Sequence, residues 1–207
     1  MKNSIFYLVL ICVTLSTNEV LGSAESCLDG NLTEYSIMRK EVYAYSILIN
    51  ELCFSRRIGV GSVVLNVPIA ALFRGEEMQQ HIFGSGLNAR GLTLYSLESN
   101  SFRSVTEPLL MERSTENISE VTVNGYKYKV AEYENGRTRL LPANNASFYV
   151  DCALQRGVTI YCTFSVFVSD SNIQYGYLVS EVEDPKSFDW MLLYSKVERF
   201  VENILIE

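Results

Sequence analysis

Histidine is almost absent from this chain, since His81 is the single one among 207 residues. Histidine is the commonest general base and the commonest metal ligand in proteins, so one copy excludes most histidine-dependent sites. A structural zinc site would also favour a Cys-x-x-Cys spacing, which the sequence lacks. Acidic neighbours such as Glu76 and Glu77 leave a carboxylate-dependent hydrolase open as a minor alternative. We therefore expect no catalytic residue, no metal and no cofactor.

Basic residues are also scarce, because 17 Lys and Arg face 24 Asp and Glu, which gives a net charge of −7. Phosphate backbones and anionic membranes select a concentrated basic surface. No phosphate-binding glycine loop, dinucleotide fingerprint or EF-hand spacing is present either. The composition argues against a nucleic acid or membrane partner and suits a protein partner, in particular a basic one.

Long apolar runs are missing except near the start, where Met1-Lys2-Asn3 is followed by an apolar stretch from Ile5 to Leu15. This run is too short for a bilayer of roughly 30 Å, which takes about 20 helical residues. Small residues follow at Gly22-Ser23-Ala24, as a signal-peptide cleavage site requires. We predict a signal peptide over residues 1–24 and an exported domain over 25–207, located in the periplasm or, alternatively, secreted.

Four cysteines lie beyond residue 24: Cys27, Cys53, Cys152 and Cys162. An even number in an exported chain indicates two disulfides. If residues 147–154 and 158–168 form a hairpin about Gly157, Cys152 lies opposite Cys162, and directly opposed strand residues are within reach of a disulfide. The sequence therefore predicts the pairs Cys152–Cys162 and, by elimination, Cys27–Cys53.

The first half of the chain gives mixed signals. Apolar residues from Thr33 to Leu52 recur every three or four positions, which indicates a helix, although the β-branched and aromatic content of residues 42–48 leaves a strand open. A Val- and Gly-rich segment from Arg57 to Val67 predicts one strand ending at Pro68. Residues 70–83 fit a short helix or an edge strand, and the pattern does not choose between them.

The second half is dominated by hairpin signals. The polar segment from Asn100 to Glu120 predicts a long loop and a possible subdivision of the domain. Asn124-Gly125 and Asn135-Gly136 each favour a two-residue hairpin turn. A further hairpin joins the predicted strands 158–168 and 173–182, and alternate residues of the first strand, Ile160 to Val168, form a face that should be buried.

The C-terminal segment predicts an amphipathic helix capped by Asp184, with Pro185 at its first position. Its apolar stripe consists of Trp190, Leu193, Tyr194, Val197, Val201 and Ile204. Such a stripe packs against other elements. The fold class is therefore α+β, with an antiparallel sheet built from hairpins and a C-terminal amphipathic helix packed on it.

Two segments resemble a known family. Cys53 to Pro68 resembles a cysteine-led strand ending in proline, and the stretch from Cys152 to Cys162, a following hairpin and Phe188-Asp189-Trp190 opening a helix resemble the end of the same proteins. These are periplasmic immunity proteins of type VI secretion effector–immunity pairs. The resemblance implies a chain that binds a toxic effector stoichiometrically and occludes its active site.

Candidate contacts for such a partner come from the loop-rich middle of the chain: Tyr95, Glu98, Glu107, Glu112 and Glu116. A tyrosine cluster could add to a recognition surface or could line the core: Tyr126, Tyr128, Tyr133, Tyr161, Tyr175 and Tyr177. An alternative to the immunity protein is a secreted structural or surface glycoprotein, because Asn31, Asn117 and Asn145 each begin an Asn-x-Ser/Thr acceptor.

Overall fold

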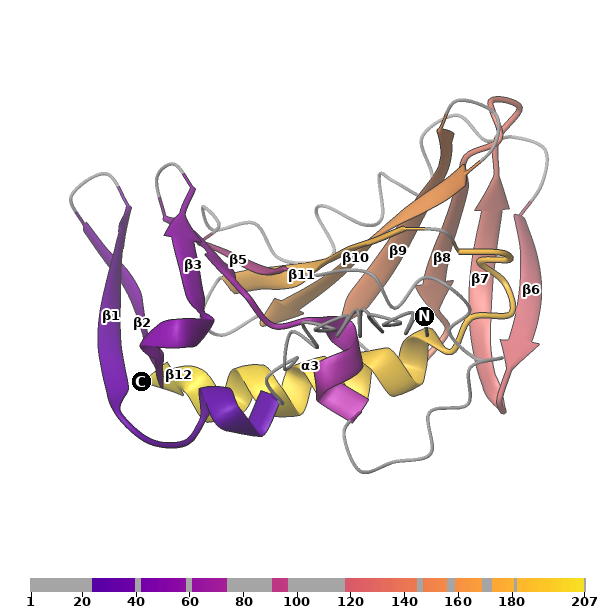
Figure 1. Cartoon of the computed structure of the whole chain (residues 1–207). Coiled ribbons are helices and arrows are strands. Elements are labelled where there is room, and N and C mark those ends of the chain that lie inside the picture. The colour runs from indigo at the N-terminus through magenta and orange to yellow at the C-terminus, as the bar shows by residue number, and fades with distance from the viewer. Residues whose placement is uncertain are drawn as a thin grey trace, which may run out of the picture.

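A computed structural model of the chain describes residues 24–39, 42–58, 61–73, 91–96, 118–144, 147–155, 159–168, 173–180 and 182–206. Within these residues the chain forms two antiparallel sheets and one α-helix, α3 (Trp190–Ile204). Figure 1 shows the helix running along one side of the larger sheet. The expected combination of antiparallel sheet and C-terminal helix is present, but strands predominate, so the fold is mainly β.

The larger sheet has nine strands in the order β3-β4-β5-β11-β10-β9-β8-β7-β6. In that order the strands are Phe54–Arg57, Ser62–Leu65, Leu92–Ser96, Ile173–Ser180, Thr159–Val168, Phe148–Gln155, Thr138–Pro142, Tyr126–Glu132 and Ile118–Val123. Strands β6 to β11 follow one another as a meander, and β11 then pairs with the earlier β5. Strands from both sides of the segment 97–117 thus belong to one sheet.

The smaller sheet has the order β1-β2-β12 and contains Leu32–Arg39, Val42–Asn50 and Leu205–Ile206. The helix predicted over residues 33–52 is therefore wrong, because this region is the β1–β2 hairpin. Tyr45, Ile47 and Ile49 are buried in a period of two, which is the period of a strand. The β-branched and aromatic content outweighs the accidental helical spacing.

Two short strands replace the single strand predicted from Arg57 to Val67. Gly61, with a φ of 74°, lies directly before β4, and the backbone N–H of Ile58 donates to the carbonyl of Ser62 at 2.9 Å. Glycine reaches this φ without steric cost, so the chain reverses here. Beyond β4, the 3₁₀-helix η3 (Ile69–Phe73) begins the region whose structure the sequence left open. Residues 74–90 lie outside the described part.

Both Asn-Gly pairs lie in hairpin turns, but the turns differ. Asn124 and Gly125 have φ values of 48° and 84°, as a two-residue type I′ turn requires. In the second hairpin only Gly136 is positive, and the Tyr133 N–H donates to the Arg137 carbonyl at 2.9 Å. That loop therefore has three residues with glycine in the left-handed position, not two. Strand β6 also begins at Ile118, inside the predicted loop.

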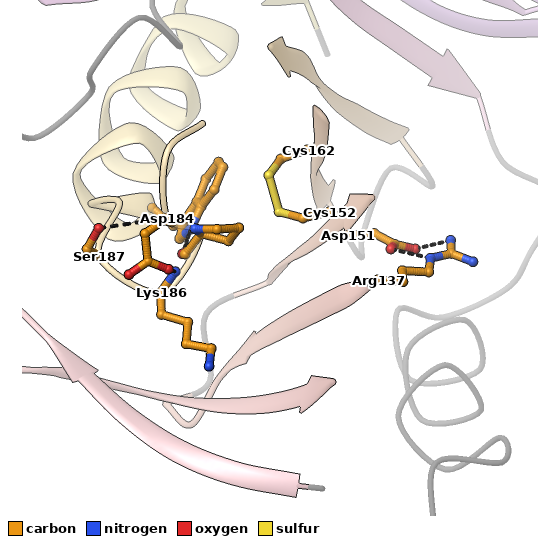
Figure 2. The surroundings of a disulfide bond; sticks show 9 residues. Arg137, Asp151, Cys152, Cys162, Asp184, Lys186 and Ser187 are labelled. Carbon is orange, nitrogen blue, oxygen red and sulfur yellow. Dashed lines mark hydrogen bonds and ion pairs between the residues drawn. A yellow bond between two sulfur atoms is a disulfide. The ribbon is translucent and has the colours of Figure 1, made fainter. Parts of the chain in front are cut away.

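Helix α3 begins five residues later than predicted, because Asp189 and not Asp184 is its N-cap. The Asp189 carboxylate accepts from the Leu192 N–H at 2.9 Å. Asp184 instead accepts from the Lys186 N–H at 2.9 Å within a preceding turn. Figure 2 shows this turn, in which Ser187 also donates to the Asp184 carbonyl. The Pro185 carbonyl accepts from the buried Trp190 indole at 2.8 Å, which holds the turn against the helix.

Aromatic contacts attach α3 to the large sheet. The ring centroids of Phe164 and Trp190 lie 6.1 Å apart, and those of Phe148 and Tyr194 lie 5.0 Å apart. The apolar stripe predicted on the helix is buried apart from the half-buried Tyr194. Within the described residues, α3 does not have the length and apolarity that a membrane-crossing helix needs.

The smaller sheet and the segment after β4 close the same core. From the small sheet, Tyr45 donates its hydroxyl to the Leu94 carbonyl at 3.3 Å. From the large sheet, Tyr177 donates to the Val67 carbonyl at 2.9 Å. Both hydroxyls satisfy buried carbonyls across distant parts of the chain, so they tie the two sheets and the segment directly after β4 into one packed body.

Candidate protein-binding surface

The large sheet has a second face that points away from α3. On β10, Cys162, Phe164 and Val166 are buried on the helix side, so the residues between them point to the opposite side. We call that side the distal face. Its central residues are Thr93 and Tyr95 on β5, Thr163 and Ser165 on β10, and Gln174, Gly176 and Leu178 on β11.

A hollow of about 390 Å³ lies over the centre of the distal face, along β5, β10 and β11. Its rim includes Tyr95, Gln174 and Leu178, and its floor includes the directly paired Ser165 and Gly176. Small residues on the floor beneath larger residues on the rim explain why the surface is hollowed here. The hollow is thus produced by the strand pairing of residues that are distant in the sequence.

Gly176 is required at this position by a close approach of β10. A Cβ atom on Gly176 would lie 1.9 Å from the carbonyl oxygen of Phe164 and 3.1 Å from the Cα of Ser165. Real Cβ atoms do not approach backbone this closely, so any other residue forces the two strands apart. Glycine inside a strand often marks such a backbone approach.

The rim combines exposed apolar groups with polar neighbours. Tyr95 is 41% exposed and pairs across the ladder with Gln174, while Leu178 is 61% exposed and pairs with Thr163. A tyrosine gives a large contact area together with a hydroxyl for hydrogen bonding. Exposed aromatic and aliphatic groups beside a hollow are typical of the residues that anchor a protein partner.

A fixed charged cluster, formed by Arg137 directly before β8, Arg139 on β8 and Asp151 on β9, lies further along the distal face. The Arg137 guanidinium holds both oxygens of Asp151, one of them at 2.6 Å, as Figure 2 shows. Arg139 donates to Asp151 at 3.2 Å and to the Tyr133 hydroxyl at 3.1 Å. The hydrogen bond to Asp151 raises the pKa of Arg137. Two cations share one carboxylate here, so the cluster has a net positive charge.

Both disulfides have the pairing expected from the sequence. Cys152 and Cys162 lie directly opposite in the β9–β10 ladder with Cα atoms 4.0 Å apart. Cys27 and Cys53 join the 3₁₀-helices η1 (Ala24–Cys27) and η2 (Glu51–Cys53), with Cα atoms 5.7 Å apart. Two buried disulfides fit a chain that folds in an oxidising compartment such as the periplasm or the exterior.

The residues predicted as partner contacts are placed only in part. Tyr95 lies on the distal face at the rim of the hollow. Glu98, Glu107, Glu112 and Glu116 lie outside the described residues.

The tyrosine cluster divides between core and surface. Tyr128, Tyr175 and Tyr177 are buried in the core, whereas Tyr126 is 45% exposed on β7. Burial raises the pKa of Tyr175 and Tyr177 well above the ordinary value of 10.0. Tyr128, Tyr175 and Tyr177 therefore line the core, and these three side chains cannot contact a partner.

Sequence reasoning missed Leu178 and Gln174 as surface residues. A local signal existed for Leu178, because it stands between two buried strand positions, Tyr177 and Val179, and must therefore point to the other face. The hollow itself had no local signal, since it depends on β5 pairing with β11.

No metal-binding cluster occurs in the part of the chain that the structure describes, where no three His, Cys, Asp or Glu side chains gather. His81 and the acceptors Asn117 and Asn145 lie outside that part, whereas Asn31 is exposed. Comparison with protein-family models, curated proteins and solved structures yields no match to this chain.

Proposed function

We propose that this chain is an exported protein-binding protein, an immunity protein that blocks a toxic effector by stoichiometric occlusion of its active site. The observation that carries the proposal is the hollow on the distal face with Tyr95 and Leu178 exposed at its rim. A convex apolar or polar tip of a partner fits such a hollow, and the rim residues supply anchors.

Rigidity of the surface supports the proposal. The hollow is formed by three paired strands at the centre of a nine-stranded sheet, and the neighbouring β9–β10 ladder is cross-linked by Cys152–Cys162. A preorganised surface binds without paying to order its own backbone, so more of the contact energy appears as affinity. Tight binding is what an inhibitor must achieve to neutralise a lytic toxin.

The immunity part of this proposal rests on the resemblance of two segments to periplasmic immunity proteins. The segment from Cys53 to Pro68 begins at the end of η2 and contains β3 and β4, and the segment after Cys162 leads through the β10–β11 hairpin to Asp189 and α3. The expected compartment agrees with the predicted signal peptide and the two disulfides.

The test is capture of the product of the adjacent gene by the mature chain with both disulfides intact, followed by an assay of the captured protein for lytic activity. We expect a one-to-one complex in which that activity is lost. Leu178→Ala should weaken the complex by about 2 kcal/mol, or roughly thirtyfold in Kd. Leu52→Ala is the matched control, because Leu52 is 86% exposed on η2, away from the distal face.

A second pair of variants tests the aromatic anchor. Tyr95→Ala should weaken the complex to a similar extent, whereas Tyr126→Ala removes an equally exposed tyrosine elsewhere on the sheet and should leave it unchanged. If the adjacent gene product is not captured, the immunity function is wrong, and glycan occupancy at Asn31 would then test the secreted glycoprotein alternative.

A further inference from the structure

Positive charge gathers on the distal face although the whole chain carries −7. Among the residues that the structure describes, the basic ones that lie on this face or bind to it are Arg56, Lys127, Lys129, Arg137 and Arg139, against the acidic Glu120 and Asp151. Local charge, not the average over the molecule, decides what a surface attracts. This face therefore attracts anions even though the protein as a whole is acidic.

Acidic residues predominate among the described side chains away from the distal face. Among the remaining described side chains, the acids are Glu25, Asp29, Glu34, Glu51, Glu132, Glu134, Glu183, Asp184, Asp189, Glu198 and Glu202, and the bases are Arg57, Lys186, Lys196 and Arg199. The charges are thus segregated between two sides. A segregated distribution orients an approaching charged partner toward one side before contact.

The most accessible part of this positive charge is on β7. Lys127 and Lys129 are both exposed and stand two positions apart, so their side chains leave the sheet on the same face. Across the ladder, Lys127 pairs with Thr122 and Lys129 pairs with Glu120. Arg137, whose side chain is 42% exposed, extends the positive strip toward β8 and β9.

The positive strip and the hollow lie within the reach of one interface. Strand β7 stands four places from β11 in the sheet order. With neighbouring strands about 4.8 Å apart, the separation is roughly 19 Å. A partner that buries about 800 Å² of each surface spans this distance, so one protein can contact both features.

We propose that the partner is a protein that presents an acidic surface to the strip of Lys127, Lys129 and Arg137 while its apolar tip enters the hollow beside Tyr95 and Leu178. This inference rests on the proposed function and specifies the chemistry of the partner. A basic partner, which the average charge of the chain suits, would be repelled at this face.

The experiment measures association rates with the purified product of the adjacent gene at 50 mM and 500 mM NaCl. Lys127→Glu should slow association about fivefold at low salt and little at high salt, since exposed charges act mainly on the association rate and are screened by ions. Arg199→Glu carries the same change in charge on the exposed side of α3 and should leave the rate unchanged. The double variant Glu120→Lys, Lys129→Glu exchanges the charges of one ladder pair and keeps the net charge of the face. Its association rate should therefore differ from that of wild type by less than about twofold.

The outcomes separate this inference from the proposed function. If wild-type protein forms the complex and Lys127→Glu and Arg199→Glu slow it equally, only net charge matters and the acidic contact is overturned. If Lys127→Glu accelerates association, the partner is basic at this face and the inference is again overturned, although the immunity function stands. If the wild-type chain forms no complex, the proposed function fails and this inference fails with it.

Discussion

The side-chain amide of Asn124 donates a hydrogen bond to the carboxylate of Asp189, 65 positions further along the chain. This bond joins the tip of the β6–β7 hairpin to the start of α3. The other oxygen of Asp189 accepts from the Leu192 N–H at 2.9 Å, so one carboxylate caps the helix and anchors the hairpin. Asn124 also has a φ of 48°, which asparagine tolerates better than most residues. Two separate requirements therefore favour asparagine at this turn.

Substitution of Asn124 separates these two requirements. Asn124→Gly keeps the turn conformation and loses the bond to a charged group, which should cost about 1.5 kcal/mol of unfolding free energy. Asn124→Ala also places a Cβ in the left-handed region and should cost about 1 kcal/mol more. Urea denaturation measures both values. Asn135→Gly is the control, because the Asn135 side chain accepts a hydrogen bond within its own loop, from the Arg137 N–H. Equal stability of Asn124→Gly and wild type would contradict the anchoring role.

Gly176→Ala tests the close approach that forms the hollow. The new Cβ would meet the Phe164 carbonyl at 1.9 Å, so the strands must separate, and we expect a loss of about 3 kcal/mol or more in urea denaturation. Gly125→Ala is the contrasting variant, because Gly125 has a φ of 84° but no heavy atom within 4 Å of the added Cβ. It should lose only about 1 to 2 kcal/mol, from backbone strain alone. A reversed order of the two costs would mean that β10 and β11 are not so closely apposed.

Local chemistry made part of this fold predictable. The Asn124-Gly125 turn depends only on which residues accept positive φ, and the opposition of Cys152 and Cys162 follows from counting outward from one turn. Both are decided within a short stretch of sequence. The same holds for the apolar stripe of α3, because helical periodicity is a property of one segment.

Features set by distant contacts were not predictable. The helical spacing of residues 33–52 favours a helix and only the composition of residues 42–48 leaves a strand open, since the β1–β2 hairpin depends on a core in which Ile47 pairs with Leu205. Asp184 and Asp189 are both chemically suitable caps, and the choice is made by the Trp190 indole binding the Pro185 carbonyl. Tertiary contacts decide between local alternatives of similar free energy.

The candidate site shows the same division. The sequence alone suggests Tyr95 as a partner contact. Its position at the rim of a hollow, however, results from the pairing of β5 with β11, which the sequence does not show. The positive strip could not be seen in the composition either, because a net charge of −7 conceals which strand face holds the lysines. Alternation within β7 places Lys127 and Lys129 on one face, but only the pairing of β7 with β8 places Arg139 opposite Ala131, two positions from Lys129, with Arg137 two positions beyond Arg139.

The two disulfides should differ in their reduction. Cys53 is 7% exposed and Cys27 lies in the short helix η1, whereas Cys152 and Cys162 are at most 1% exposed in the middle of the sheet. Thiolate attack requires access to sulfur. In native buffer, dithiothreitol should therefore open Cys27–Cys53 first, and Cys152–Cys162 only on global unfolding. Alkylation of the freed thiols followed by mass spectrometry measures the order in which the two disulfides are reduced. Denatured protein, in which both disulfides should be reduced together, is the control. Earlier opening of Cys152–Cys162 would show that the sheet opens locally.

Buried tyrosines should make the protein unstable in alkali. Burial is the largest cause that raises the pKa above 10.0 for Tyr45, Tyr128, Tyr175, Tyr177 and Tyr194. The folded state thus holds these protons more tightly than the unfolded chain, so their stabilisation is complete below pH 10 and is lost as pH rises above it. The free energy of unfolding should be constant from about pH 7 to 9 and should then decline, as measured by urea titration at each pH.

Tyr177→Phe isolates one of these groups. The variant loses the hydrogen bond to the Val67 carbonyl and should be about 1 kcal/mol less stable at pH 7. Above pH 10 the free energy of unfolding of both proteins should decline, and the slope for the variant should be smaller by about 1.4 kcal/mol per pH unit. The reason is that the variant has one buried phenol fewer to ionise on unfolding. Tyrosinate absorbance recorded with circular dichroism checks the mechanism. If all tyrosines ionised near pH 10 while the native spectrum persisted, the buried hydroxyls would be accessible to solvent and this account of alkaline unfolding would be wrong.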